Sequence, residues 1–169
     1  SNVSSAFPPS TAFRMNMRKY FKFLVYLIAI YGVSVSRAGS YEDFFQAIVR
    51  DDAPAVTALL DRGFDADSRD PNGQTGLAVA LRGDSMTVAA ALVDHPALEV
   101  NALNDVGESA LMLVAIKGEL ELARRLLKRG AAVNQPGWAP LHYAASGPGT
   151  QVVGLLLDSG ADIDAGSPN

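Results

Sequence analysis

Residues 137–144 read GWAPLHYA, and two earlier stretches of the chain share their pattern of glycine, small and apolar residues. These stretches are GQTGLAVA at residues 73–80 and GESALMLV at residues 107–114. Their central leucines, Leu77, Leu111 and Leu141, are 34 and 30 residues apart. Self-similarity at a period of about 20–50 residues indicates a stack of structural repeats.

A second landmark recurs at three places along the chain. It reads LLDRGFDAD at residues 59–67, LLKRGAAVN at residues 126–134 and LLDSGADID at residues 156–164. Its glycines, Gly63, Gly130 and Gly160, are placed where a left-handed residue ends a helix. Short helices are predicted over Gly76–Arg82, Ala110–Lys117 and Pro140–Ser146, and second helices near Pro54–Arg62, Met86–Val93, Glu119–Arg129 and Gln151–Ser159.

Side chains suited to helix starts support these ranges. Thr75 and Ser109 can each accept a backbone N–H at the first turn, and Pro140 fits the first helical position. No helix pair of this size buries its apolar face alone, so stacked neighbours must supply the core.

The sequence resembles the ankyrin repeat, over about residues 41–169. The opening motif of that family is fullest at Ala139–His142, and its closing motif is fullest at Leu156–Asp164. The resemblance implies an all-α solenoid of about four helix-turn-helix repeats with short β-turn fingers. The repeats are expected at about residues 41–70, 71–105, 106–136 and 137–169, and His142 is expected in hydrogen bonds that tie neighbouring repeats.

Several departures from the repeat pattern predict local differences. Residues 43–46 read DFFQ where the opening motif is expected, as an N-terminal cap could. Pro96 replaces the usual glycine of the second repeat. The connection at residues 134–137 is about three residues shorter than usual, so we expect a stunted third finger.

The two ends of the stack carry further expectations. Val56, Ala58 and Leu59 are expected to face inward at the start. Leu155, Leu156 and Leu157 are expected to leave apolar surface open after the last repeat. Since residues 167–169 align with the start of another repeat, residues 39–169 are expected to form an ankyrin-repeat domain truncated at its C-terminus.

The N-terminal region has the pattern of a secretory signal. Three basic residues, Arg18, Lys19 and Lys22, precede a fourteen-residue uncharged run from Phe23 to Ser36. This run is short for a membrane-spanning helix, which needs about 20 apolar residues. Small residues at Ser36 and Ala38 fit cleavage after Ala38.

Translation from Met15 or Met17 makes residues 15–38 the signal peptide and residues 1–14 a tag or an upstream non-native segment. The resemblance to exported ankyrin proteins of Gram-negative bacteria implies a periplasmic or secreted protein. The alternative is an ankyrin scaffold anchored in the inner membrane by an uncleaved segment at residues 23–36.

Charge argues against nucleic acid as a partner. Residues 39–169 hold 18 acidic and 9 basic residues, a net charge of −9, whereas residues 1–38 hold five basic residues and no acidic one. Phosphate binding relies on Lys and Arg, so an acidic body disfavours DNA and RNA. Membrane contact is expected only through the N-terminal segment, if it is retained.

No catalytic, cofactor or metal set is visible in the sequence. The chain has no cysteine and two histidines, His95 and His142, without zinc-ligand spacing. No Gly-x-Ser-x-Gly elbow is present. We therefore predict a non-enzymatic protein without cofactors, and an enzyme of unknown class is the second alternative.

Two acidic motifs also have simpler explanations. The cluster at Asp61, Asp65, Asp67 and Asp70 fails as a calcium loop, which needs glycine at position six and glutamate at position twelve. The tripeptide at residues 82–84, Arg-Gly-Asp, spells an integrin-binding motif but is expected in the turn between paired helices.

What remains is a binding surface for another protein. In ankyrin proteins the fingers and inner helices form a concave binding face, and the resemblance places twelve residues on it. They are Arg69, Asn72, Gln74, Arg82, Asn104, Val106, Glu108, Ile116, Lys117, Trp138, Tyr143 and Ser146. Trp138 and Tyr143 belong to residue types that dominate interface energetics. The alternative for Trp138 is that it packs on the neighbouring finger.

Overall fold

The computed structural model describes residues 39–166, which belong to a compact unit, Gly39–Asn169. Residues 39–49 are helical. The following helices are α2 (Ala53–Asp61), α3 (Gly76–Arg82), α4 (Met86–Asp94), α5 (Ala110–Lys117), α6 (Leu120–Lys128), α7 (Pro140–Ala145) and α8 (Thr150–Asp158). All seven predicted helices are present with bounds within one residue of the prediction, so the expected all-α repeat architecture is confirmed.

The predicted signal peptide, its cleavage site after Ala38 and the upstream residues 1–14 lie outside the described residues, as do residues 167–169. Among residues 39–166, no helix has both the length and the apolar character needed to cross a bilayer.

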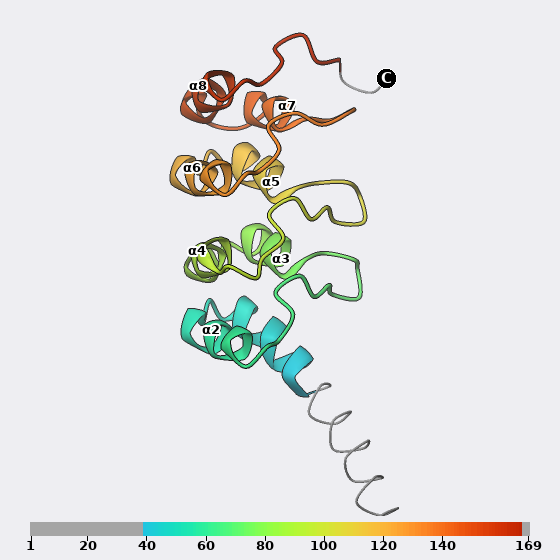
Figure 1. The fold of residues 1–169 in the computed structure, drawn as a ribbon, viewed down its shortest axis with the longest axis vertical. Helices are drawn as coiled ribbons and strands as arrows, with labels where there is room; N and C mark the ends of the chain where they lie inside the picture. The colour runs from blue at the N-terminus through green and yellow to red at the C-terminus, as the bar shows by residue number, and fades with distance from the viewer. Residues whose placement is uncertain (1–38, 167–169) are drawn as a thin grey trace, which may run out of the picture. The chain divides into compact units, whose positions relative to one another are not determined.

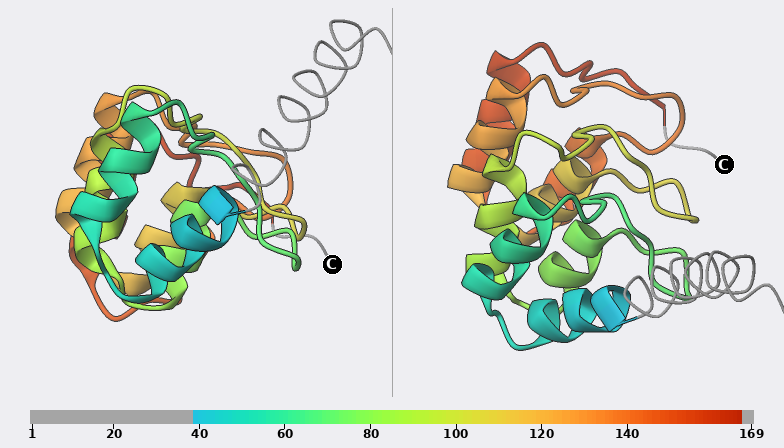
Figure 2. Two further views of the ribbon diagram at one scale, coloured as in Figure 1. Left: turned by 90° about the horizontal axis from the view of Figure 1, so that it is seen from below. Right: turned by 60° about the horizontal axis from the view of Figure 1, so that its bottom comes forward.

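The helices form two rows with loops along one side. Helices α3, α5 and α7 make the inner row, and α2, α4, α6 and α8 make the outer row (Figure 1). Neighbours along each row contact one another, and so do the paired helices of each repeat. The loops project from the inner side as three fingers (Figure 2), which we define as finger 1 (65–75), finger 2 (99–109) and finger 3 (132–139).

Side-chain caps start two of the inner helices as predicted. Thr75 Oγ1 accepts the backbone N–H of Ala78 at 3.2 Å, and Ser109 Oγ accepts that of Met112 at 3.3 Å. Each cap satisfies a donor that has no partner within the helix. Pro140 occupies the first turn of α7, also as predicted.

The fingers differ in regularity. An isolated antiparallel bridge closes finger 1 between Arg69 and Thr75, and another closes finger 2 between Leu103 and Ser109. In the described part of the chain, finger 3 has no such bridge. The prediction of a stunted third finger is therefore confirmed.

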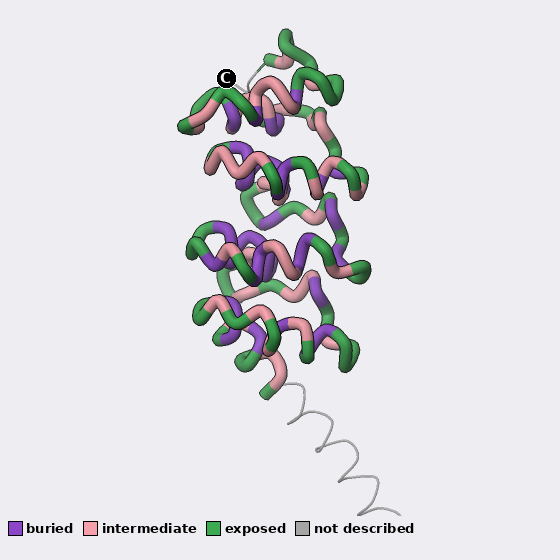
Figure 3. Tube along the Cα trace, turned by 90° about the vertical axis from the view of Figure 1, so that its left-hand side faces the viewer, coloured by how far each residue is buried: buried purple, intermediate pink, exposed green. Residues whose placement is uncertain are grey.

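The core runs between the two rows and recurs at each level of the stack (Figure 3). In the first repeat Phe44, from the DFFQ stretch at residues 43–46, and Ile48 are fully buried, so this segment supplies the first apolar layer of the core. A Cβ added at Gly76 would lie 2.7 Å from the Phe44 ring. Glycine is therefore needed there for α3 to approach the first repeat closely.

Two expectations about the ends of the stack are wrong. Ala58 is exposed, because the buried face of α2 carries Val56, Leu59 and Leu60, and Ala58 lies on the opposite side of the turn. Leu156 is fully buried, because α8 turns it toward the core that it shares with α6 and α7. Leu157 is exposed, as expected.

A recurrent asparagine ties the second repeat to the third and the third to the fourth. Asn101 Nδ2 donates to the carbonyl of Gly130 at 3.2 Å, and its Oδ1 accepts the N–H of Ala132 at 2.8 Å. Asn134 makes the same pair of bonds to the fourth repeat, each 2.9 Å long. One side chain thus fixes both a carbonyl and an amide beyond the helix end of the following repeat.

The first repeat has a carboxylate in this position. The Asp67 carboxylate accepts the N–H of Glu99 at 3.0 Å, but this side chain has no N–H group to donate to the neighbouring carbonyl. Burial raises the pKa of the Asp67 carboxyl, and the carboxylates of Asp65 and Glu99 add to that rise against the hydrogen bond from Glu99. The ionised form of this side chain is therefore less stable in the folded protein than in water.

Candidate protein-binding surface

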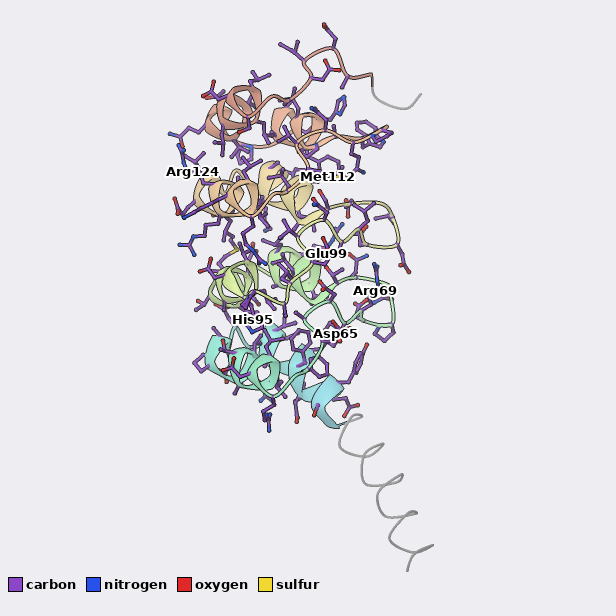
Figure 4. The ribbon with its side chains drawn as sticks, viewed as in Figure 1. Asp65, Arg69, His95, Glu99, Met112 and Arg124 are labelled. Carbon is purple, nitrogen blue, oxygen red and sulfur yellow. The ribbon has the colours of Figure 1, made fainter. Side chains whose placement is uncertain are left out.

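The twelve predicted binding residues come from the three fingers and from α3, α5 and α7. Seven are exposed: Arg69, Asn72, Arg82, Val106, Ile116, Trp138 and Ser146. Four are half-buried: Gln74, Glu108, Lys117 and Tyr143. The surface is opposite the outer row, as the labelled side chains of Arg69 and Arg124 illustrate (Figure 4).

Asn104 is buried, so its assignment as an exposed binding residue is wrong. Its Nδ2 donates to Gln74 Oε1 at 3.0 Å and to Glu108 Oε2 at 2.7 Å. Its Oδ1 accepts the N–H groups of Val106 and Glu108 at 3.1 and 2.8 Å. The turn of finger 2 closes around this side chain, which holds the finger in shape rather than facing a partner.

Glu108 is the centre of a polar network across three repeats. Arg82 of α3 forms an ion pair with its Oε2, and the Tyr143 hydroxyl of α7 donates to its Oε1 at 3.2 Å. Burial alone would raise the pKa of Glu108. Hydrogen bonds from Asn104, Arg82 and Tyr143, with the charge of Arg82, outweigh burial and lower that pKa.

The same network acts on Tyr143. Burial, followed by the negative charge of Glu108, raises the pKa of the Tyr143 hydroxyl. That hydroxyl therefore remains a hydrogen-bond donor at neutral pH, and the ring is held in one position.

Beside Tyr143 the surface is hollowed. A depression of about 200 Å³ is lined by Ile116, Trp138, His142, Tyr143 and Ser146, and we call it the aromatic hollow. All of these except His142 were predicted from the sequence to bind a partner. Half of the Trp138 surface is exposed, at 51%. A large apolar side chain could be accommodated against these walls.

His142 fixes one wall of the aromatic hollow. Its Nδ1 accepts the N–H of Ala139 at 3.0 Å, which leaves Nε2 to donate to the carbonyl of Ala165 at 2.9 Å. The ring also meets Trp138 edge to face, with centroids 5.6 Å apart. His142 therefore has a structural role, but both of its partners lie in the fourth repeat, so the prediction that it ties neighbouring repeats is wrong. Trp138 packs on this ring of its own repeat.

The cations of the surface are already paired within the chain. Arg69 contacts Asp105 at 3.3 Å and donates to the Leu103 carbonyl at 2.6 Å, so it joins fingers 1 and 2. Lys117 forms an ion pair with Asp84. Because Arg82 is paired with Glu108, both charged ends of the Arg-Gly-Asp tripeptide are held by neighbouring groups.

The acidic cluster of the first repeat stabilises turns. Asp65 accepts the N–H of Asp67 at 2.9 Å, and Asp70 accepts those of Asn72 and Gln74 at 2.9 and 2.8 Å. Within residues 39–166 no group of three or more candidate side chains is arranged to hold a metal ion.

One hollow was missed by the sequence analysis. A depression of about 520 Å³ lies between the first and second repeats and is lined by residues that include Tyr41, Phe45, Val49, Pro71 and Val79. Tyr41, Phe45 and Val49 recur every four residues, a spacing that places them on one helix face. That four-residue spacing is the signal in the sequence that could have predicted this depression.

The chain shares sequence with known repeat proteins. A family model described as ankyrin repeats (3 copies) matches residues 97–167. A putative ankyrin repeat protein of Rickettsia bellii is 29% identical over 119 residues, covering 64% of this chain and 33% of that protein. Ankyrin repeat and SAM domain-containing protein 6 of Rattus norvegicus is 45% identical over 94 residues, covering 53% of this chain and 11% of that protein.

A match of the same length involves a human protein. Transient receptor potential cation channel subfamily A member 1 is 27% identical over 119 residues, covering 69% of this chain and 11% of the channel subunit. The chain therefore spans between 11% and 33% of the length of these three relatives.

The stacked helix pairs and projecting fingers define a repeat solenoid, a class that binds through extended surfaces. This chain belongs to the ankyrin-repeat family. Ankyrin repeats are protein–protein interaction modules.

Proposed function

We propose that this chain is an exported, non-catalytic binding module that holds a partner protein on its fingers and inner helices. The observation that carries the proposal is the aromatic hollow. It presents Trp138, Ile116 and Tyr143 together on the surface that the resemblance assigns to binding. Buried aromatic anchors supply most of the energy in many protein interfaces.

The polar groups of the surface support binding over catalysis. The Glu108 carboxylate is engaged by Asn104, Arg82 and Tyr143, so it is a poor general base. Both nitrogens of His142 are engaged by backbone groups. A catalytic base needs a free position toward substrate, and neither side chain has one.

The partner can be identified by affinity purification from the native periplasm followed by mass spectrometry. In titrations with it, Trp138→Ala should weaken binding by about 1–3 kcal/mol. Arg124→Ala, on the outer row, should change it by less than about 0.5 kcal/mol. If Arg124→Ala abolished binding and Trp138→Ala left it unchanged, the binding face proposed here would be wrong. Thermal melts separate either effect from unfolding.

Export forms the second half of the proposal and is supported by the basic start and uncharged run of residues 18–36. N-terminal sequencing of protein isolated from its native host should find Gly39 first. Retention of residues 23–36 in a membrane fraction would instead favour the anchored scaffold.

A further inference from the structure

We infer that the partner segment held at the aromatic hollow is basic, with a large apolar side chain close to a lysine or arginine. The inference rests on the proposed function and specifies the chemistry of the partner. It follows from a second hollow beside the first and from the charges left unpaired around both.

The second depression has a volume of about 410 Å³ and is lined by Asn134, Gln135, Pro136, Gly137, Asp162, Ala165 and Gly166. We call it the polar hollow. Lining residues of the two hollows adjoin one another, because His142 of the aromatic hollow bonds to the carbonyl of Ala165, and Gly137 of the polar hollow directly precedes Trp138. A short peptide segment can therefore reach both hollows with neighbouring side chains.

Among the described residues that line the polar hollow, Asp162 is the only one with an ionisable side chain. Its Oδ1 accepts the N–H of Asp164 at 3.0 Å, and both residues are exposed. In the described range, no cation lies within ion-pairing distance of either carboxylate. Two negative charges thus flank the hollows from the segment that follows α8.

The basic residues of fingers 1 and 2 and of the inner helices do not neutralise the carboxylates of Asp162 and Asp164. Arg82 and Lys117 are bound to Glu108 and Asp84, and Arg69 is bound to Asp105. Finger 3 itself contributes no charged residue. Residues 39–169 also carry a net charge of −9. The electrostatic complement of such a surface is a positively charged segment, and an acidic one would be repelled.

The two hollows would recognise different parts of the partner segment. Trp138, Tyr143 and Ile116 would cover a Trp, Phe, Leu or similar side chain. Asp162 would face the ammonium or guanidinium group of a neighbouring residue. The apolar contact supplies most of the affinity, whereas the charge selects among segments and speeds association.

Selection from random 12-residue displayed peptides on the full chain tests this without knowledge of the natural partner. Enriched peptides should combine a net positive charge with a large apolar residue next to or near Lys or Arg. A synthetic copy of one enriched peptide is then titrated by fluorescence polarisation. Its affinity should decrease as salt is raised.

Matched variants assign the contacts. Trp138→Ala should lower affinity by about tenfold or more. Asp162→Asn keeps the acceptor for the Asp164 N–H and should lower affinity about two- to fivefold, but not for a peptide whose basic residue is replaced by alanine. Asp158→Asn, an equal change of charge on α8, should leave affinity unchanged.

The outcomes separate this inference from the proposed function. Enriched peptides that are neutral or acidic yet depend on Trp138 would overturn the inference and leave the binding surface in place. Peptides whose affinity is unaffected by Trp138→Ala would contradict both. Failure to enrich any peptide would overturn the inference, because it requires that a short linear segment suffices for binding.

Discussion

Replacing Asp67 with asparagine should stabilise the protein, because the later repeats use asparagine in the same position. Asn101 makes one bond as donor and one as acceptor to the following repeat, at 3.2 and 2.8 Å. Asp67 keeps only the acceptor bond, at 3.0 Å from the Glu99 nitrogen. An amide at this position could also donate to the carbonyl of Ala97, two residues before Glu99.

The magnitude follows from one added hydrogen bond and one removed charge. A net intramolecular hydrogen bond contributes about 0.5–1.5 kcal/mol. Removing the carboxylate also ends its repulsion by Asp65 and Glu99. The hydrogen bond from the Glu99 N–H becomes weaker, because its acceptor is then a neutral amide oxygen. We expect the free energy of unfolding to rise by about 1 kcal/mol, and the melting temperature by about 3–5 °C for a domain of this size.

The effect should depend on pH with a definite sign. Because the folded-state pKa of Asp67 is raised, ionisation of this group costs stability as pH increases from the ordinary aspartate value through the raised one. The Asp67→Asn variant lacks that cost. Its advantage should therefore be smallest in acid, below the ordinary pKa, and constant above the raised pKa.

Urea unfolding followed by circular dichroism, at about pH 3.5 and about pH 7, measures both quantities. The matched control is Asn101→Asp, which removes the donor to the Gly130 carbonyl and should destabilise by about 1–2 kcal/mol at neutral pH. A neutral or destabilising Asp67→Asn at pH 7 would refute the hydrogen-bond argument. An equal gain at both pH values would refute the electrostatic part.

Three other substitutions test the network and the fingers. Glu108→Gln should lower the free energy of unfolding by about 1–2 kcal/mol near pH 7, because it weakens the bonds from Arg82 and Tyr143. Since the pKa of Glu108 is lowered, its stabilisation is lost as pH falls through that value, so a deficit that stays constant in acid would contradict this reading. Gly73→Ala and Gly107→Ala both place alanine at positive φ, +72° and +80°, at a cost of about 1 kcal/mol each. Only Gly73 would also bring a Cβ within 1.7 Å of the exposed Asp105 carboxylate, so Gly73→Ala should be the less stable variant in thermal melts, and equal melting temperatures would show that Asp105 moves aside freely.

The repeat pattern predicted where each helix begins and ends, but it did not predict which face of each helix is buried. The aligned units place most helices shortly before a glycine, and caps at Thr75 and Ser109 mark two of the starts, so the bounds agree with the structure within one residue. Ala58 and Leu156 were nevertheless assigned to the wrong environment. In a run of apolar residues such as those before Gly160, composition does not show which side of the helix faces the core.

The binding surface was predictable by position but not in its internal bonds. The family pattern identified the residues of the fingers and inner helices, and it included Asn104 although finger 2 closes around that side chain. The pairs Arg82–Glu108 and Asp84–Lys117 join residues 26 and 33 positions apart. Such separations approximate one repeat, so opposite charges one period apart are a signal that could have indicated these pairs.

These internal bonds also determine how the surface can recognise a partner. Arg69, Arg82, Glu108 and Lys117 are each held by neighbours within the chain. Breaking those bonds to form new ones would return little net energy, because every new contact replaces an existing one. Side chains fixed before binding also lose little freedom on association. The discriminating contacts must then come from groups that have no such partner. On this surface such groups include the exposed side chains of Ile116, Val106 and Trp138 and the carboxylates that follow α8.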